Sequence, residues 1–269
     1  MKIDISKNES DEIFSDILFD YVENQQLTSL ENPKGVILGG QPGSGKSYLQ
    51  EKIYQEFKEK FIFISTDDLR PYHPAYSALQ QNPETIQNAA NLVNPYASAW
   101  TERLIEHCIT QKYNLIIDST LGGNTEAVYR TIDMYRKNGY QVHLRVMAVP
   151  AIISKLSIFL RYETQLAEKG FARWTRMADH DDRFEKLEMV LEEITNSKKI
   201  DSIKFYQRVF GDDGTIELKA FDAWETFKTV RNSLDNHTKK FVKKTSERVL
   251  DLIQKRKGDL SEFESLGLL

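Results

Sequence analysis

The sequence predicts an α/β protein with a mostly parallel central sheet, helices on both faces of the sheet, and added helices at both ends of the chain. Short apolar runs alternate with helix-like stretches over residues 34–169, as is typical of parallel strands connected by helices. Polar residues directly follow several of the apolar runs, and ligands of parallel sheets gather at the carboxyl ends of the strands. With 269 residues and 40% hydrophobic content, the chain suits one large domain or one domain with a small appendage.

The N-terminal elements follow from hydrophobic spacing. Apolar side chains recur every three or four residues in 9–26, which indicates an amphipathic helix. An apolar run predicts a first strand over residues 35–39, and a helix is expected over 48–58. A second apolar run, residues 61–64, predicts the next strand.

The middle of the chain continues the alternation. Residues 84–112 predict a long helical stretch that breaks near Pro95, because proline lacks a backbone N–H and its ring disturbs a helix interior. A third strand is predicted at 114–117, a helix near 125–138, and a fourth strand at 140–148.

The C-terminal elements differ in character. A helix is predicted over 150–168, since its leading proline suits a first helical turn. Charged helices are expected beyond 177. Residues 203–210 and 215–218 flank a Gly-Asp-Asp-Gly turn and predict a hairpin. The tail from residue 220 is predicted to be helical.

A complete phosphate-binding loop lies between the first strand and the next helix. Residues 40–47 match G-x-x-x-x-G-K-[ST] without a gap. Glycines let backbone N–H groups surround a phosphate, Lys46 reaches the terminal phosphates, and the Ser47 hydroxyl binds Mg²⁺. The guanine-specifying N-K-x-D signature is absent, so we expect ATP with Mg²⁺ and a P-loop kinase-like three-layer fold. The residues expected to bind the nucleotide are Gly40, Gln41, Pro42, Gly43, Ser44, Gly45, Lys46, Ser47 and Tyr48.

Acidic residues follow the second and third strands. Side chains alternate along an extended segment, so only one of Asp67 and Asp68 can face a γ-phosphate. A carboxylate at that place can accept the proton of an attacking hydroxyl, or both residues can cap the following turn. Asp118 can hold Mg²⁺ through water or cap a turn. The residue pattern leaves these alternatives open.

Five segments resemble the zeta-toxin family, the kinase toxins of epsilon/zeta toxin–antitoxin systems. They are GVILGGQPGSGKS, FISTDDLRPYHPAY, YNLIIDST, FLRYET and FARWT, in one collinear order over roughly residues 34–182. The resemblance implies ATP- and Mg²⁺-dependent phosphorylation of a hydroxyl on the amino sugar of UDP-N-acetylglucosamine or a related UDP-sugar. It also implies that a small antitoxin protein holds the activity in check.

The resemblance implies a role for each matching residue. Asp67 would be the general base and Lys46 the phosphate-loop lysine, whereas Arg161 and Arg173 would grip the triphosphate. A guanidinium fork matches the oxygens of a transferring phosphoryl group, and the short stretch around Arg173 suits a lid. Without the resemblance, a surface ion pair would account for Arg161. The residues matched on the substrate side are Arg70, His73, Glu102 and Thr120.

The chain departs from the family pattern at three places. Ser65 stands where the family commonly has an acid, Asp118-Ser119-Thr120 replaces Glu-Gly-Thr, and Arg176 stands where a proline often follows the lid. These positions surround the acceptor and the metal. Two alternatives are therefore kept: a P-loop kinase of another small-molecule hydroxyl, such as an antibiotic or a nucleotide, and a nucleotide-dependent interaction module with little turnover.

Bulk properties bound the setting and the domain organisation. A net charge of −4 argues against general nucleic-acid affinity, and no apolar run approaches the roughly 18–20 residues of a membrane span. We expect a cytoplasmic protein without nucleic-acid or membrane partners. His180 is expected at a solvated helix start. The expected parts are an N-terminal helical segment packed on the core (1–33), a P-loop kinase domain (34–219) and a helical C-terminal extension (220–269).

Overall fold

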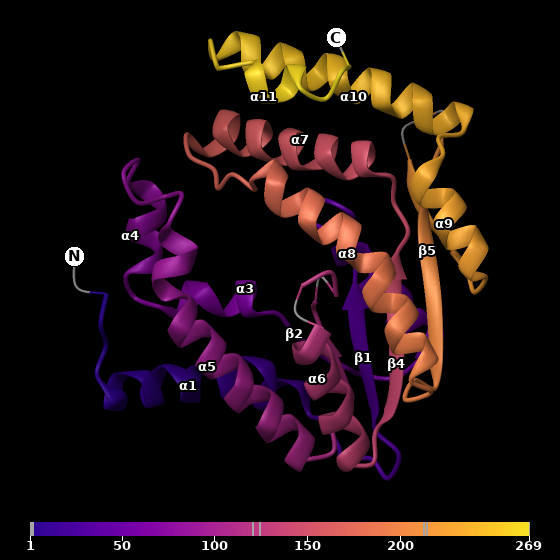
Figure 1. The fold of residues 1–269 in the computed structure, drawn as a ribbon. Coiled ribbons are helices and arrows are strands. Elements are labelled where there is room, and N and C mark those ends of the chain that lie inside the picture. Colours follow the sequence, from indigo (N-terminus) through magenta and orange to yellow (C-terminus); the bar gives the residue numbers. More distant parts are fainter. Residues whose placement is uncertain (1–2, 120, 124, 212, 214, 269) are drawn as a thin grey trace.

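The computed structural model describes residues 3–119, 121–123, 125–211, 213 and 215–268. It shows a six-stranded sheet with helices on both faces (Figure 1). The strand order is β2-β3-β1-β4-β5-β6, and all neighbouring strands are parallel except β5 and β6. The predicted three-layer α/β fold is confirmed. Within the described ranges, no helix has both the length and the apolar character needed to cross a membrane.

The elements lie close to the predicted ranges. The strands are β1 Lys34–Gly39, β2 Ile62–Ile64, β3 Leu115–Ile117, β4 Gln141–Met147, β5 Ser202–Phe210 and β6 Ile216–Phe221. The helices are α1 Lys7–Tyr21, α2 Leu49–Phe57, α3 Thr66–Leu69, α4 Tyr76–Gln81, α5 Ala89–Thr110, α6 Thr125–Lys137, α7 Ala151–Lys169, α8 Met177–Asn196, α9 Trp224–Asn232, α10 Asn236–Lys255 and α11 Ser261–Glu264.

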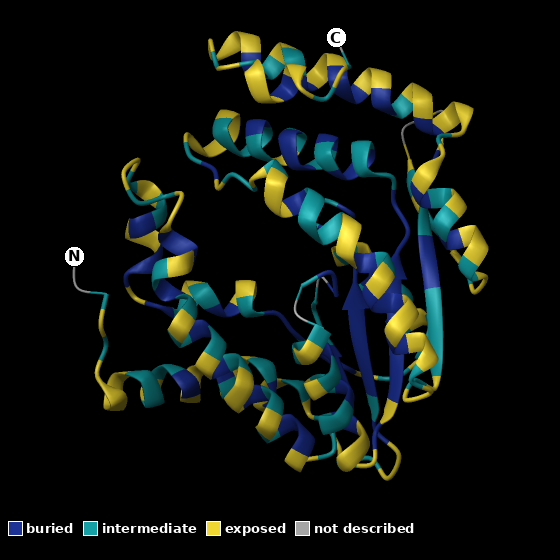
Figure 2. Cartoon of the chain, viewed as in Figure 1, coloured by how far each residue is buried: buried dark blue, intermediate teal, exposed yellow. Residues whose placement is uncertain are grey.

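The core lies on both faces of the sheet. Along β1, Val36 and Leu38 point to one face and Ile37 to the other, because successive side chains of a strand alternate. The face of Ile37 is covered by α1, α5, α6, α8 and α9. The opposite face is covered by α2, α7, α10 and α11. Figure 2 shows the central strands as the buried middle layer, which leaves their ends as the place for a site.

The predicted break in the long helix is wrong. The helix α5 begins at Ala89 and continues through Pro95 to Thr110. Proline removes one backbone donor, but Val93 and Ala97 on either side of it are fully buried. Their burial holds the two halves of α5 in one helix.

The predicted hairpin is confirmed, and it belongs to the central sheet. The strand β5 is parallel to β4, and β6 returns antiparallel to it as the edge strand. Residues Ala220 and Phe221 lie in β6, so the helical tail begins later than predicted, at Trp224. Phe221 packs against the ring of Phe205 on β5 at 5.7 Å between centroids, which extends the strand.

Candidate active site

The sheet register brings three strand ends to one edge. Ile64 of β2 and Ile37 of β1 both pair with Ile117 of β3. The phosphate loop follows β1, Asp67 follows β2 by three residues, and Asp118 follows β3 directly. Because these strands are parallel, the segments that follow them emerge at the same carboxyl edge.

Glycine conformations shape the phosphate loop. Gly40, Gly43 and Gly45 have positive φ angles of 144°, 76° and 92°. A Cβ atom on Gly43 would lie 2.1 Å from the backbone oxygen of Ser154, so only glycine fits there. The loop leads into a 3₁₀ turn, Lys46–Tyr48, and then into α2. Ser47 is exposed in that turn, so its hydroxyl is open to a ligand.

Lys46 is the centre of the charged residues around the loop. Its Nζ donates to the carbonyl oxygen of Gly40 at 3.0 Å. Burial lowers the pKa of Lys46, the charges of Asp118 and Asp67 oppose that shift, and Arg161 adds to it. The structure therefore brings both acids and one of the two predicted arginines into electrostatic range of the phosphate-loop lysine.

Asp118 offers an oxygen suited to a hard cation. Its Oδ1 is buried without a hydrogen-bond partner. Burial raises the pKa of Asp118, the charge of Lys46 opposes this, and Asp67 adds to it. Mg²⁺ usually takes one or two carboxylates together with phosphate oxygens and water, so Asp118 and the Ser47 hydroxyl fit this ion. In the described part of the chain, no group of three or more His, Cys, Asp or Glu could hold a metal by itself.

Asp67 is held by an arginine rather than left loose. Its side chain is 67% exposed in the first turn of α3, and its Oδ1 lies 2.6 Å from Nη1 of Arg70. Nη2 of Arg70 donates to Oδ1 of Asn94 on α5 at 3.0 Å. The carboxylate orientation is thus set from α5. Asp68 lies toward Tyr21 of α1, where burial and then the charge of Asp68 raise the tyrosine pKa to about 12.

The two predicted arginines lie near each other. Arg161 is exposed on α7, and its Nη2 donates to the hydroxyl of Thr175 at 3.0 Å. Surrounding protein atoms lower the pKa of Arg161, the charge of Arg173 adds to this, and Asp67 opposes it. Arg173 is exposed in residues 171–176, which form no helix or strand. Trp174 anchors this segment, with its ring 4.9 Å from Phe159.

The predicted substrate residues have different surroundings. Glu102 is exposed on α5, next to Thr101, whose hydroxyl lies 3.1 Å from that of Thr66. His73 is 1% exposed, and its Nδ1 accepts from the Ala75 backbone N–H at 3.2 Å. The imidazole thus packs inside the turn after Asp67. Thr120 lies outside the described residues.

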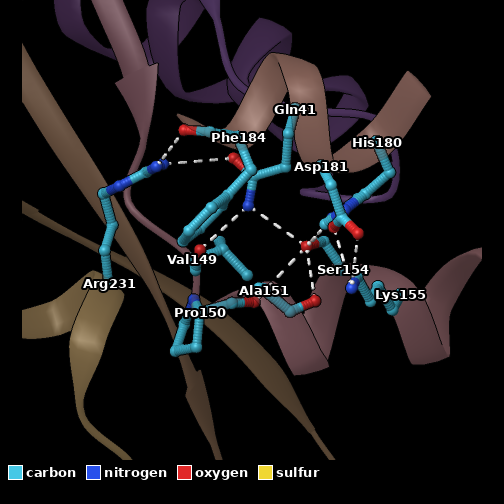
Figure 3. Close-up of polar contacts among 10 residues, drawn as sticks. All are labelled: Gln41, Val149, Pro150, Ala151, Ser154, Lys155, His180, Asp181, Phe184 and Arg231. Carbon is cyan, nitrogen blue, oxygen red and sulfur yellow. Dashed lines mark hydrogen bonds and ion pairs between the residues drawn. The ribbon is translucent and has the colours of Figure 1, made fainter. Parts of the chain in front are cut away.

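Sequence patterns missed a buried network beside the phosphate loop. His180 is fully buried rather than solvated, with Nε2 2.7 Å from Oγ of Ser154 (Figure 3). Its ring contacts Ser154 of α7, the helix against which α8 packs. Nη1 of Arg231 on α9 donates to Oε1 of Gln41 at 3.4 Å. A separation of 190 residues leaves no local signal for that contact. Asn94 was missed as well, and its place one residue before Pro95 gave no functional signal.

Comparisons with known proteins agree with this architecture. The family model described as Zeta toxin matches residues 20–214. The chain is 34% identical over 204 residues to Toxin zeta of Streptococcus pyogenes, covering 75% of this chain and 70% of that protein. It is 30% identical over 246 residues to Toxin zeta of Streptococcus agalactiae, covering 88% and 82%.

Solved structures show the same fold. A chain from the PezAT chromosomal toxin–antitoxin system of Streptococcus pneumoniae superposes with a TM-score of 0.78 at 21% identity, covering 94% of this chain and 99% of that one. The AvrRxo1-ORF1:-ORF2 structure with ATP gives a TM-score of 0.51 at 14% identity, covering 86% and 72%.

Proposed function

The chain belongs to the zeta-toxin family, and from this premise we propose that it is an ATP- and Mg²⁺-dependent kinase of a UDP-sugar. The acceptor would be a hydroxyl on the amino sugar of UDP-N-acetylglucosamine or a close relative. The observation that carries the proposal is the electrostatic grouping of Asp67, Lys46 and Arg161 at the carboxyl edge of the sheet. A nucleotide-binding module without transfer would need the lysine but not this acid and arginine.

The donor would be held by the phosphate loop. Backbone N–H groups of residues 40–47, apart from Pro42, would surround the phosphates, and Nζ of Lys46 would exchange the Gly40 carbonyl for a terminal phosphate oxygen. Asp118 and the Ser47 hydroxyl would hold Mg²⁺, which neutralises phosphate charge when bound. Burial of Lys46 in the protein strengthens its electrostatic interaction with an anion, since less water screens it.

The transfer would use Asp67 as the base. Arg70 binds Oδ1, and Oδ2 would accept the proton of the attacking hydroxyl. The acceptor oxygen then forms a bond to the γ-phosphorus as the bond to the ADP oxygen breaks. Arg161 and Arg173 would stabilise the charge spread over the phosphoryl oxygens, a contribution of about 10³–10⁵ in rate for a well-placed arginine.

The biological role would be that of a toxin. The relatives named Toxin zeta and the PezAT toxin–antitoxin system support this role and a small protein antitoxin as the partner. Phosphorylation of a sugar nucleotide would withdraw it from cell-wall synthesis. Growth arrest on expression, relieved by co-expression of a small protein from the adjacent reading frame, is the expected result. Normal growth at a high protein level would contradict it.

The reaction is tested by incubating purified protein with ATP, Mg²⁺ and UDP-N-acetylglucosamine and analysing the sugar nucleotide by mass spectrometry. We expect one added phosphate on the amino sugar, and much less on UDP-glucose, which lacks the N-acetyl group. ATP consumption with no phosphorylated sugar nucleotide would contradict the proposal. Incubation with a metabolite extract would then identify another hydroxyl acceptor, and tight ATP binding with no phosphorylated acceptor would favour an interaction module.

A further inference from the structure

A side chain of the phosphate loop is turned into the protein. Gln41 is fully buried, and its Nε2 donates to the carbonyl oxygen of Val149 at 2.9 Å and to Oγ of Ser154 at 3.1 Å (Figure 3). Its Oε1 accepts from Nη1 of Arg231 at 3.4 Å. Both ends of the amide are thus bound by the protein, so this side chain serves the shape of the loop.

Arg231 reaches the loop from α9, the first helix of the C-terminal extension. It is 4% exposed, its Nη2 donates to the carbonyl oxygen of Phe184 at 2.6 Å, and its guanidinium lies 3.9 Å from the centre of the Phe184 ring. Burial lowers its pKa to about 10, opposed by the charge of Glu188, so it remains charged at neutral pH. A buried charge is costly unless it is hydrogen-bonded, and here α8 and the phosphate loop supply the acceptors.

Helix α8 supplies the second support. Nε2 of His180 lies 2.7 Å from Oγ of Ser154, and Nδ1 lies 2.8 Å from Oδ1 of Asp181. A carboxylate at Nδ1 keeps the imidazole proton there, so Nε2 accepts from the Ser154 hydroxyl. Nζ of Lys155 in turn binds Asp181 at 2.8 Å. Donation therefore runs in one direction, from Gln41 through Ser154 and His180 to Asp181.

The order of these groups looks like that of a serine hydrolase triad, but the setting excludes that chemistry. Ser154 and His180 are fully buried, and Oγ of Ser154 also lies 3.0 Å from the carbonyl oxygen of Ala151. A nucleophile must reach an acyl carbon, and no substrate can approach this oxygen. His180 and Asp181 can only orient the Ser154 hydroxyl, whose oxygen accepts the hydrogen bond from Nε2 of Gln41.

Rigid support matters at this position because of the neighbouring glycines. Gln41 lies between Gly40 and Gly43, which both have positive φ and give the unbound loop many alternative conformations. A site whose competent geometry is populated only part of the time binds its ligand more weakly by that fraction. Fixing the Gln41 amide at both ends limits the loop to one geometry.

We propose that Arg231 and His180 are positioning residues that hold the phosphate loop, through Gln41, in the conformation that accepts the nucleotide. Helix α9 is then part of the nucleotide site, although it contributes no atom to the phosphates. This inference rests on the proposed nucleotide-dependent function. It concerns only the donor site and is independent of the identity of the acceptor.

The test measures ATP affinity by isothermal titration calorimetry with Mg²⁺ and no acceptor. Arg231→Met should raise the ATP Kd about tenfold, because a hydrogen bond from a charged group is lost at the loop. Arg231→Lys should restore part of the affinity, since it keeps one charged donor. Lys228→Met is the matched control: it removes a cation from the same helix, where Lys228 pairs with Glu225, and should leave the Kd unchanged.

A double-mutant cycle separates positioning from general destabilisation. If Arg231 acts through Gln41, then Gln41→Met/Arg231→Met should bind ATP no more weakly than Gln41→Met alone. If the two substitutions each raised the ATP Kd and their factors multiplied in the double variant, the proposal would be overturned. An unchanged Kd in Arg231→Met would also overturn it. If Arg231→Met does not fold, unchanged ATP affinity in Gln41→Met or in His180→Leu, neither of which can make these hydrogen bonds, overturns it equally. Wild-type protein that binds no ATP would refute the proposed function and this inference together, whereas wild-type binding with unaltered variants would refute the inference alone.

Discussion

The carboxylate of Asp67 is the residue on which the proposed chemistry depends most directly. It is exposed at the carboxyl edge of the sheet, its Oδ1 is bound by Arg70, and its charge acts on Lys46 and Arg161. The ion pair and the two charge interactions place it among the cations that a triphosphate would meet. Its exposure leaves room for an acceptor hydroxyl.

Replacing Asp67 with asparagine should abolish phosphoryl transfer and leave ATP binding intact. The amide keeps the shape of the side chain but cannot take the hydroxyl proton, and general-base catalysis contributes about 10²–10⁴ in rate. Turnover with the sugar nucleotide and the ATP Kd are the two measurements. Asp68→Asn is the matched control, because Asp68 lies toward Tyr21 and should keep near-normal turnover. Full activity in Asp67→Asn would remove the base from the mechanism.

Site residues that belong to a contiguous motif could be predicted from the sequence. Residues that reach the site only through long-range contacts could not. The phosphate loop is contiguous, so its glycines, Lys46 and Ser47 are visible as one motif. The arginines required the family resemblance in addition. Gln41 falls within the motif, but its partner Arg231 follows 190 residues later, and only packing of α9 brings them together.

At the scale of elements, hydrophobic spacing predicts where strands and helices lie. It does not predict how tertiary packing changes their limits. Pro95 predicted a break by its intrinsic chemistry, yet buried neighbours keep α5 continuous. The sequence predicts a helix from Ala220, yet Ala220 lies in β6 and pairs with Tyr206 of β5. In both cases the tertiary contact outweighs the local preference, and single-sequence patterns contain no record of that contact.

The pairing of β4 and β5 predicts an acid dependence of stability. His143 on β4 pairs with Ser202 on β5, and its Nδ1 lies 2.9 Å from Oγ of that serine. Burial, followed by the charge of Arg145, lowers the pKa of His143 to about 4 from its ordinary value of 6.5. Between these two values the unfolded chain takes up a proton that the folded chain does not. The free energy of unfolding therefore falls as pH decreases through this window, by at most roughly 3 kcal/mol.

His143→Gln should flatten that dependence, because glutamine can bind Ser202 without titrating. Urea unfolding at pH 8, 7, 6.5, 5.5 and 4 measures the free energy of unfolding of both proteins. The two curves should run parallel above pH 7, where the imidazole is neutral in both states, which controls for a general change in stability. An equal loss of stability in the variant between pH 6.5 and 4 would show that His143 is not responsible.

At the scale of the whole molecule, the C-terminal helices are a structural layer of the protein. Val249 and Ile253 of α10 and Phe263 of α11 are buried in the same core cluster as α2 and α7 (Figures 1 and 2). The proposed boundary at residue 220 therefore marks a change in sequence composition. We expect residues 220–269 to be needed for the stability of the core. Arg231 gives the extension a second link, to the phosphate loop itself.

One ion pair tests how strongly that layer is attached. Glu163 of α7 is 2% exposed, and it receives two hydrogen bonds from Arg256 at the end of α10, at 2.6 Å from Nε and 2.7 Å from Nη2. Arg256→Met should lower the free energy of unfolding by about 2–3 kcal/mol, because it leaves a buried carboxylate without its partner. Lys255→Met is the matched control: its pair with Asp251 is exposed, so the change should stay within about 0.5 kcal/mol.

A double variant separates two causes of this lower stability: the unpaired buried carboxylate of Glu163 and the lost packing of the Arg256 side chain. In Glu163→Gln/Arg256→Met the buried group is neutral, so the double variant should unfold at a higher urea concentration than Arg256→Met alone. Equal midpoints in these two proteins would assign the effect to the aliphatic part of Arg256 instead. A loss in Arg256→Met no larger than that in Lys255→Met would mean that the C-terminal layer is held by its apolar contacts, with Glu163 able to reach water on its own.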